Sequence, residues 1–338
     1  MIKVARYIFS ICAAALLLFS FTCCRRIPLH DPGSNVFLKI NIELRSNVEL
    51  NEDLNIEGDA YLMEKVYGKK PEMMRACFYD IESHELVYEF YLPPEGDFID
   101  ILPGEYDLIV YSLGNEATRV ESTEKRGTGR AFTNRTGESV NGTVSDATSG
   151  TKATGSQAVI FEPDHLYAGR LEKVKVPVME DDDPTFIIDI PVSTILDTYS
   201  FEIINIVGAG RIQKADIYIT GQAPSKYLWD LRYPSIPASI YFQASVNYSK
   251  EHIYTIFNTF GKFPGETNLC YINVLLTDGR GEKFLWVFDV TEQFDNPDNT
   301  RHEIIIDERI EIPEKGNAGG FNIGVQGYQT VIIPVVIG

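Results

Sequence analysis

The residues best suited to covalent chemistry are two cysteines near the start of the chain, Cys23 and Cys24. They close an apolar run over residues 8–21 that follows a short positively charged start. A run of this length matches the core of a signal peptide and is short for a membrane span. A cysteine at the end of such a core is typical of a bacterial lipoprotein, in which it is acylated and becomes the first mature residue. We therefore predict a signal peptide over 1–23, lipidation at Cys24 and an exported, lipid-anchored chain.

The choice between the two cysteines depends on the residues before each of them. A cleavage box favours an apolar residue three positions before the cysteine and a small residue directly before it. Phe21 and Cys23 meet this for Cys24 better than Ser20 and Thr22 do for Cys23, which stays the alternative. An ordinary cleaved signal with incidental cysteines is the competing interpretation. Two or more acyl chains, at about 0.8 kcal/mol per buried methylene, would anchor the chain stably through a tether over 24–34.

Signatures of catalysis are missing from the sequence. It contains no GxSxG, HExxH, P-loop, GxGxxG after a strand, or CxxC motif. Asp97 with Asp100, and Asp278 with Glu282, could form carboxylate pairs, but a chain with 48 acidic residues produces such pairs by chance. The five histidines show no metal-ligand spacing. We expect no enzyme activity, no catalytic residues, no metal and no cofactor.

Two aromatic residues, Tyr227 and Trp229, could form a platform for a sugar or another ligand. They lie close together in a stretch with further tyrosines, which favours an exposed surface. Trp286, by contrast, lies within an apolar run and is expected to pack in a core. We therefore name Tyr227 and Trp229 as possible binding residues, with core packing as the competing interpretation.

Composition limits the class of partner. The chain has 338 residues, 44% hydrophobic and 12% aromatic, with a formal net charge of −18. This is enough apolar content for packed cores, and about two domains are expected for the length. The negative charge repels nucleic acid, so no nucleic-acid partner is expected. Cys77 and Cys270 lie in separate apolar stretches and are expected to be buried free thiols.

The elements that must position these residues are strands. Residues 35–45 alternate, with Leu38, Ile40, Ile42 and Leu44 on one face, which predicts a strand with one buried face. Further strand patterns recur along the chain up to 329–337, and few stretches have helical periodicity. The turn at Pro103-Gly104, followed by an alternating strand, is common in prealbumin-like β-sandwiches.

This pattern predicts an all-β chain with two tandem prealbumin/transthyretin-like antiparallel β-sandwich domains. We place the domains at 35–178 and 179–338, because the acidic stretch 180–183 before Pro184 interrupts the strand pattern. Residues 122–156 are rich in Gly, Ser and Thr and are predicted to be a flexible insertion in the first domain.

The chain resembles the fimbrillin-like lipoproteins of Bacteroidales, in particular an uncharacterised-domain family grouped with the FimB-type anchor or accessory pilus subunits. The resemblance covers most of residues 24–338. It rests on the order of the first strand and of segments shared along the chain: CRRIPLHDP from residue 24, MRACFYD from 74, LVYEF from 86, LPGEYDLIVY from 102, FNTFG from 257 and YINVLLTDG from 271.

The resemblance implies a lipoprotein of the cell outer membrane, at the surface or at a pilus base, whose partners are other fimbrillin-like subunits. In that family, subunits assemble by β-strand complementation after a protease cuts behind an arginine and frees the first strand. Arg45-Ser46 is the bond of this sequence that matches such a processing site. Anchor-type members keep the first strand. For a polymerising subunit, the strand-like residues 329–337 are the best donor segment in this chain.

Two interpretations stay open. The first is a structural subunit of a fimbrillin-type pilus, either an anchor or an accessory subunit. The second is a cell-surface binding module for a glycan or a host protein, which would use 122–156 or the region of Trp229.

Overall fold

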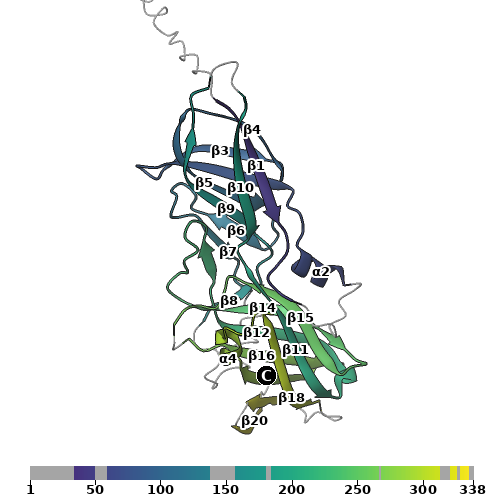
Figure 1. Cartoon of the computed structure of the whole chain (residues 1–338). Helices are drawn as coiled ribbons and strands as arrows, with labels where there is room; N and C mark the ends of the chain where they lie inside the picture. Colours follow the sequence, from purple (N-terminus) through teal and green to yellow (C-terminus); the bar gives the residue numbers. More distant parts are fainter. Residues whose placement is uncertain are drawn as a thin grey trace, which may run out of the picture.

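The computed structural model describes residues 34–49, 59–137, 157–179, 184–265, 268–312, 320–325 and 328–334. The chain is almost entirely β-structure and forms two bodies stacked end to end (Figure 1). Each body is a nearly closed sheet around its own apolar core. The predicted all-β class with two tandem β-sandwiches is therefore confirmed.

The first body is a seven-stranded sheet. In spatial order its strands are β3 (Leu86–Leu92), β2 (Met73–Asp80), β5 (Gly104–Leu113), β9 (Tyr167–Val176), β10 (Phe186–Thr194), β1 (Ser34–Glu43) and β4 (Gly96–Ile101). All neighbouring pairs are antiparallel except β1 with β10, which run in parallel.

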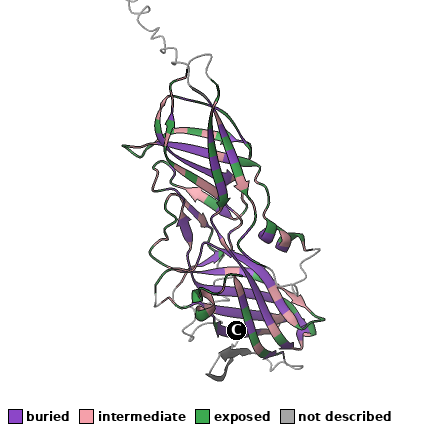
Figure 2. Cartoon of the chain, in the orientation of Figure 1, coloured by how far each residue is buried: buried purple, intermediate pink, exposed green. Residues whose placement is uncertain are grey.

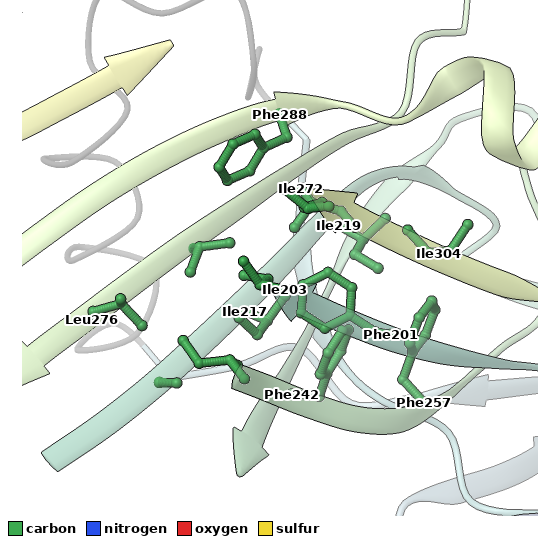
Figure 3. Packing of buried hydrophobic residues seen from close by; sticks show 14 of the residues in the cluster. Phe201, Ile203, Ile217, Ile219, Phe242, Phe257, Ile272, Leu276, Phe288 and Ile304 are labelled. Carbon is green, nitrogen blue, oxygen red and sulfur yellow. The ribbon is translucent and has the colours of Figure 1, made fainter. Parts of the chain in front are cut away.

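The second body is a larger sheet. In spatial order its strands are β18 (Glu303–Glu311), β11 (Asp197–Val207), β15 (His252–Thr259), β14 (Ala238–Asn247), β12 (Ile212–Gln222), β16 (Tyr271–Asp278), β17 (Lys283–Asp289), β19 (Gly320–Val325) and β20 (Tyr328–Pro334). The short strand β8 (Val159–Phe161) also pairs with β14. Figure 3 shows the core of this sheet, in which Phe201, Phe242 and Phe257 pack together with isoleucines of β11, β12 and β16.

A third, small sheet lies between the two bodies. It pairs β6 (Thr118–Glu121) with β7 (Arg130–Thr133), and β7 with β13 (Ser225–Tyr227) of the C-terminal half. A bridging cluster of buried residues surrounds it: Cys77, Tyr79, Ile109, Tyr111, Ala131, Leu166, Ile195, Leu196, Ala223, Leu228 and Phe260. Buried positions thus continue from one body into the other (Figure 2), and the two cores are joined by packed side chains.

The predicted boundary at 178/179 is wrong. It separates β9 from β10, which belong to the same sheet because β10 pairs with both β9 and β1. The change of sheet instead comes between β10 and β11. In addition, β8 from the N-terminal side joins the second sheet.

The predicted flexible insertion at 122–156 is wrong for its first part. This part contains β7, whose Ala131 is buried in the bridging cluster. Threonine hydroxyls are satisfied there by backbone carbonyls, as in the 2.8 Å bond from Thr133 to Phe161. A segment of small polar residues can therefore pack where its hydroxyls find acceptors. Residues 138–156 lie outside the described part of the chain.

Candidate functional site: the first strand and the segment after it

The first strand, β1, lies between two neighbours. It pairs in parallel with β10 over eight positions and antiparallel with β4 over six. Val36 and Leu38 are fully buried, and Ile40 is 5% exposed. The predicted face is thus confirmed, with Ile42 and Leu44 packed at its end. Both hydrogen-bonding edges of this strand are occupied, so its removal would open two neighbours at once.

The outer face of β1 is polar towards its end and aromatic near its start. Phe37 packs edge-on against Phe98 of β4, with ring centroids 5.0 Å apart. Lys39 forms an ion pair of 2.9 Å with Asp189 of β10, and both side chains are about half exposed. An exposed pair of this kind adds little stability. The core face of the strand, and not its outer face, therefore holds β1 in place.

The candidate processing bond, Arg45-Ser46, lies where the chain leaves the first sheet. The Arg45 side chain is exposed, whereas Ser46 is 6% exposed. The backbone N–H and the hydroxyl of Ser46 each donate to the carbonyl of Val66, at 3.0 Å. The arginine is accessible, but the residue after it is fixed. A protease that needs several extended residues would have to detach Ser46 first.

The residues after Ser46 dock on a short helix and on the second sheet. Helix α2 (Ala60–Tyr67) begins at Asp59, whose carboxylate accepts from the N–H groups of Tyr61 and Leu62. Val48 is 1% exposed and packs with Leu62 and Val66 of this helix and with Ile256 of β15. The segment that continues β1 is therefore part of a small core.

Two polar contacts extend this docking. The N–H of Thr198, in β11, donates to the side-chain oxygen of Asn47 at 2.9 Å. The N–H of Glu49 donates to the carbonyl of Arg301 at 3.2 Å, just before β18. The segment 46–49 thus joins the end of β1 to the far body.

A buried ion pair fixes α2 from the other side. The Lys65 ammonium lies 2.7 Å from the Glu162 carboxylate, and both side chains are less than 10% exposed. Lys65 also donates to the carbonyl of Ile256 at 2.7 Å, and Glu162 accepts from the N–H of Asn258. Burial raises the pKa of Glu162, and the ammonium of Lys65 opposes that shift. Each charge has hydrogen-bond partners, which makes its burial tolerable.

Sequence reasoning missed Lys65 and Glu162. The signal that could have found Lys65 is its place beside Val66 and three residues after Leu62, on the apolar face of an amphipathic helix. Glu162 gives no comparable signal, because it follows a short strand in a polar stretch.

A half-buried histidine completes this region. His165 donates from Nε2 to the carbonyl of Lys65 at 2.7 Å and contacts the Thr194 hydroxyl from Nδ1 at 3.2 Å. Burial lowers the pKa of His165. A cavity of about 360 Å³ lies beside it, lined by residues of α2, by the polar stretch after that helix, and by Glu162–His165. Of the charged groups that line it, Lys65 and Glu162 bind each other, and the Asp164 carboxylate accepts from the backbone N–H groups of residues 116–118.

The predicted binding residues Tyr227 and Trp229 are half-buried beside the bridging cluster. The guanidinium of Arg232 lies 3.8 Å from the ring centre of Tyr227, and that of Arg126 lies 4.6 Å from the Trp229 ring. Arg170 donates to the Trp229 carbonyl. One face of each ring is thus covered by an arginine of the same chain.

The other candidate chemical groups are occupied as well. Cys77 and Cys270 are buried free thiols, as predicted. Burial raises the pKa of Cys77 to about 11 and that of Cys270 to about 12, so neither is a thiolate at neutral pH. Asp278 accepts from Arg280 and from two backbone N–H groups of its hairpin turn, which lowers its pKa.

The described ranges contain no group of three or more metal-binding side chains. No helix within them is both long and apolar enough to cross a bilayer. Cys23 and Cys24 lie outside the described residues.

Comparison with known proteins agrees with this architecture. A family model described as "Domain of unknown function (DUF5119)" matches residues 63–243, more than half of the chain, from α2 to β14. The chain belongs to this family. The matched region of this DUF5119 member includes the buried Lys65–Glu162 pair and the bridging cluster's strands β6, β7 and β13.

Individual relatives confirm the resemblance to fimbrial anchor subunits. The chain is 23% identical, over 199 residues, to a Bacteroides ovatus protein described as "Putative fimbrium anchoring subunit Fim4B". That alignment covers 59% of this chain and 49% of the relative, so it spans about half of the relative's length.

A solved structure shares the fold. A crystal structure described as a "putative adhesin" from Bacteroides ovatus ATCC 8483 superimposes with a TM-score of 0.60 at 19% identity. The superposition covers 87% of this chain and 98% of that one. The fimbrial anchor protein Mfa2 of Porphyromonas gingivalis gives a TM-score of 0.46 at 10% identity, over 88% and 95% of the two chains.

Proposed function

We propose that this chain is a structural anchor or accessory subunit of a fimbrillin-type pilus. It is exported, lipidated at Cys24 and held at the outer membrane, and it meets other pilus subunits by β-strand complementation. The similarity to a protein named as a fimbrium anchoring subunit supports the assignment to a pilus. The sequence pattern at residues 8–24 supports the lipid anchor.

One observation favours an anchor over a polymerising subunit: β1 is paired on both edges and buried on its inner face, and the segment after it is docked. β1 has a paired strand on each edge, and Ser46 and Val48 are buried against α2. A subunit that keeps this strand keeps its covalent link from Cys24 to the folded body. The pilus base is then attached to the membrane through about ten residues of chain, which span at most roughly 35 Å.

The test is the N-terminus of the protein recovered from the cell surface. We expect a lipidated start at Cys24, labelling by a palmitate analogue and loss of labelling in a Cys24→Ala variant. A start at Ser46 would overturn the anchor assignment and support polymerisation. Labelling that survives in Cys24→Ala and disappears in Cys23→Ala would move the lipid to Cys23.

The partner assignment needs a separate test. A lipidated, membrane-bound chain should co-purify with other fimbrillin-like subunits from sheared surface material. A chain that binds a glycan and never associates with pilus subunits would support the surface binding module instead.

A further inference from the structure

At one edge of the second sheet, two side-chain amides bind the outward backbone groups of β18 in place of a neighbouring strand. Among the described strands, β18 pairs only with β11, in parallel. In a parallel pair, alternate residues of a strand direct their N–H and C=O groups to the neighbour, and the residues between direct them away. The N–H of Ser200 donates to the carbonyl of His302, so the groups of Glu303, Ile305 and Asp307 point away from β11.

Gln293 and Asn299 bind these outward groups as a neighbouring strand would. Gln293 accepts from the Ile305 N–H at 2.9 Å and donates to the Ile305 carbonyl at 3.0 Å. Asn299 accepts from the Glu303 N–H at 3.0 Å and donates to its carbonyl at 2.9 Å. Each amide therefore satisfies both backbone groups of one residue, at two successive outward positions.

The segment that carries the amides is lightly held. Helix α4 (Thr291–Asp295) has five residues, none of them buried, and no side chain caps its start. Its contacts are few: Phe294 packs against the core and Tyr199, with ring centroids 4.9 Å apart, Asp295 pairs with Lys262, and the Thr291 hydroxyl accepts from the Cys270 N–H at 2.9 Å. The Asn299 amide also donates to the Gln293 carbonyl at 3.0 Å. Segments with few buried contacts open at low cost in free energy.

The edge continues beyond the amides. A cavity of about 140 Å³ lies beside Asp307, the next outward residue after Ile305. Gln293 and residues of β17 and β18 line it. An extended chain could enter there without first displacing the amides.

The charge of the edge selects the strand that fits. The outward side chains of β18 are three acids, Glu303, Asp307 and Glu311, and one base, Arg309. Glu303 is 17% exposed and lies 3.3 Å from Arg301, and Glu311 lies 3.2 Å from Arg309, while Asp307 is exposed. Two copies of β18 paired antiparallel about Asp307 would place like charges opposite each other, which is unfavourable. An extended segment with lysine or arginine at alternate positions would face acids instead.

We propose that the β18 edge is a docking site for an extended basic strand of another subunit, and that Gln293 and Asn299 keep it closed until that strand displaces them. The proposal rests on the proposed function only for the source of the strand. The edge belongs to the second body, on which the segment after β1 docks, whereas β1 begins at the opposite end of the first sheet (Figure 1).

The test uses a fluorescent nine-residue peptide in which lysine alternates with valine, and purified chain from residue 25 onward. We expect Gln293→Ala/Asn299→Ala to bind it at least about tenfold tighter than wild type, because two competing amides are gone. Thr300→Ala, an exposed neighbour in the same loop, is the matched control and should bind like wild type. The same peptide N-methylated at alternate amides has equal charge and should show no gain.

Other results would overturn the proposal. Equal gains for the plain and methylated peptides would mean attraction by charge alone. No gain in a folded double variant would mean that the amides do not compete with a strand. Dimerisation of the variant, seen by light scattering, would identify a second copy as the partner and exclude the basic strand. If the double variant does not fold, Gln293→Met, which loses both the acceptor and the donor and adds no charge, replaces it with the same expected direction. None of these outcomes depends on lipidation or on the pilus.

Discussion

β1 and β18 are comparable strands that the fold protects in different ways. Each runs parallel to one strand of its own sheet, β10 or β11, and buries alternate residues in a core. The second edge of β1 is covered by another strand, β4, whereas the second edge of β18 is covered by two side-chain amides. The β4 neighbour is held to β1 by a ladder of backbone hydrogen bonds, while each amide is held to β18 by two hydrogen bonds. The second edge of β1 is thus more firmly covered than that of β18.

Removal of β1 should have the largest effect. A chain beginning at Ser46 loses Val36, Leu38 and Ile40, each of which contributes about 1.5–3 kcal/mol of burial, and it exposes the edges of β4 and β10. The total is a large part of a typical stability of about 5–15 kcal/mol. We expect an unfolded or aggregated first body, measured by circular dichroism and light scattering.

A pair of controls calibrates this prediction. Lys39→Ala, on the outer face of β1, should leave the protein folded, since its ion pair is half exposed. Leu38→Ala should cost about 2–5 kcal/mol, as should Ile304→Ala in β18, because both side chains are fully buried. A stable, monomeric chain from Ser46 would contradict the role given to β1.

The sequence predicts β1 well because its information is local. Leu38 and Ile40 alternate with Phe37 and Lys39, and one buried face is sufficient to produce that pattern. The turn residues Thr277-Asp-Gly-Arg280 are likewise local and indicate a hairpin, which is present between β16 and β17.

The pairing between distant elements could not be predicted. Nothing local in β10 indicates that it pairs in parallel with β1, so the domain boundary was placed too early. Trp229 lies in an apparently exposed stretch, but Arg126 and Arg170, far away in the chain, cover its ring and bind its carbonyl. The sequence does not reveal the role of Gln293 and Asn299, because it depends on their position beside the edge of β18, which only the tertiary structure shows.

Breaking the buried ion pair should have the second largest effect. Lys65→Met leaves the Glu162 carboxylate buried without its cation, and such a loss typically costs about 3–5 kcal/mol. Because Lys65 holds α2, the docking of Ser46 and Val48 should weaken with it. We therefore expect an arginine-specific protease to cleave after Arg45 faster than in wild type. N-terminal sequencing of the fragments identifies the cleaved bond.

The double replacement separates the two effects. Lys65→Met/Glu162→Gln removes both charges and should recover much of the stability. Cleavage after Arg45 that is as slow in Lys65→Met as in wild type would show that α2 does not protect this bond.

Acidification should have a smaller effect, at the point where the segment after β1 meets the start of β18. His302 contacts Asn47 and packs against Tyr199, and burial lowers its pKa, as it does for His165. The unfolded chain therefore binds more protons than the folded one near and below the unfolded histidine pKa of about 6.5. Stability should be fully present above that pH and decline as the pH falls through the lowered folded values.

Urea unfolding at pH 7.5, 6.0 and 5.0 measures this slope. His302→Asn should flatten it, because the variant lacks the titrating imidazole. Asparagine also tolerates the left-handed backbone at this position, where φ is 55°. His84→Asn is the matched control, because His84 has a similar φ of 59° and an exposed side chain. An equal slope in wild type and His302→Asn would assign the pH dependence to other groups.

Opening the β18 edge by one residue should have the smallest effect. Gln293→Ala removes two hydrogen bonds, worth together about 1–3 kcal/mol at most, and water can replace them at an accessible edge. The loss of global stability should therefore be about 1 kcal/mol or less. The local effect is more pronounced, because the Ile305 N–H loses its acceptor and with it its protection from exchange with water.

Hydrogen exchange distinguishes these two scales. The Ile305 amide should exchange faster in Gln293→Ala, while the Ile304 and Ile306 amides, directed to β11, should keep their protection. For β1, which has a strand on each side, no single side-chain replacement on the outer face should expose one amide in this way; Lys39→Ala is the corresponding variant. If Gln293→Ala instead released all of β18 at once, the edge would be a cooperative part of the sheet and the contrast with β1 would disappear.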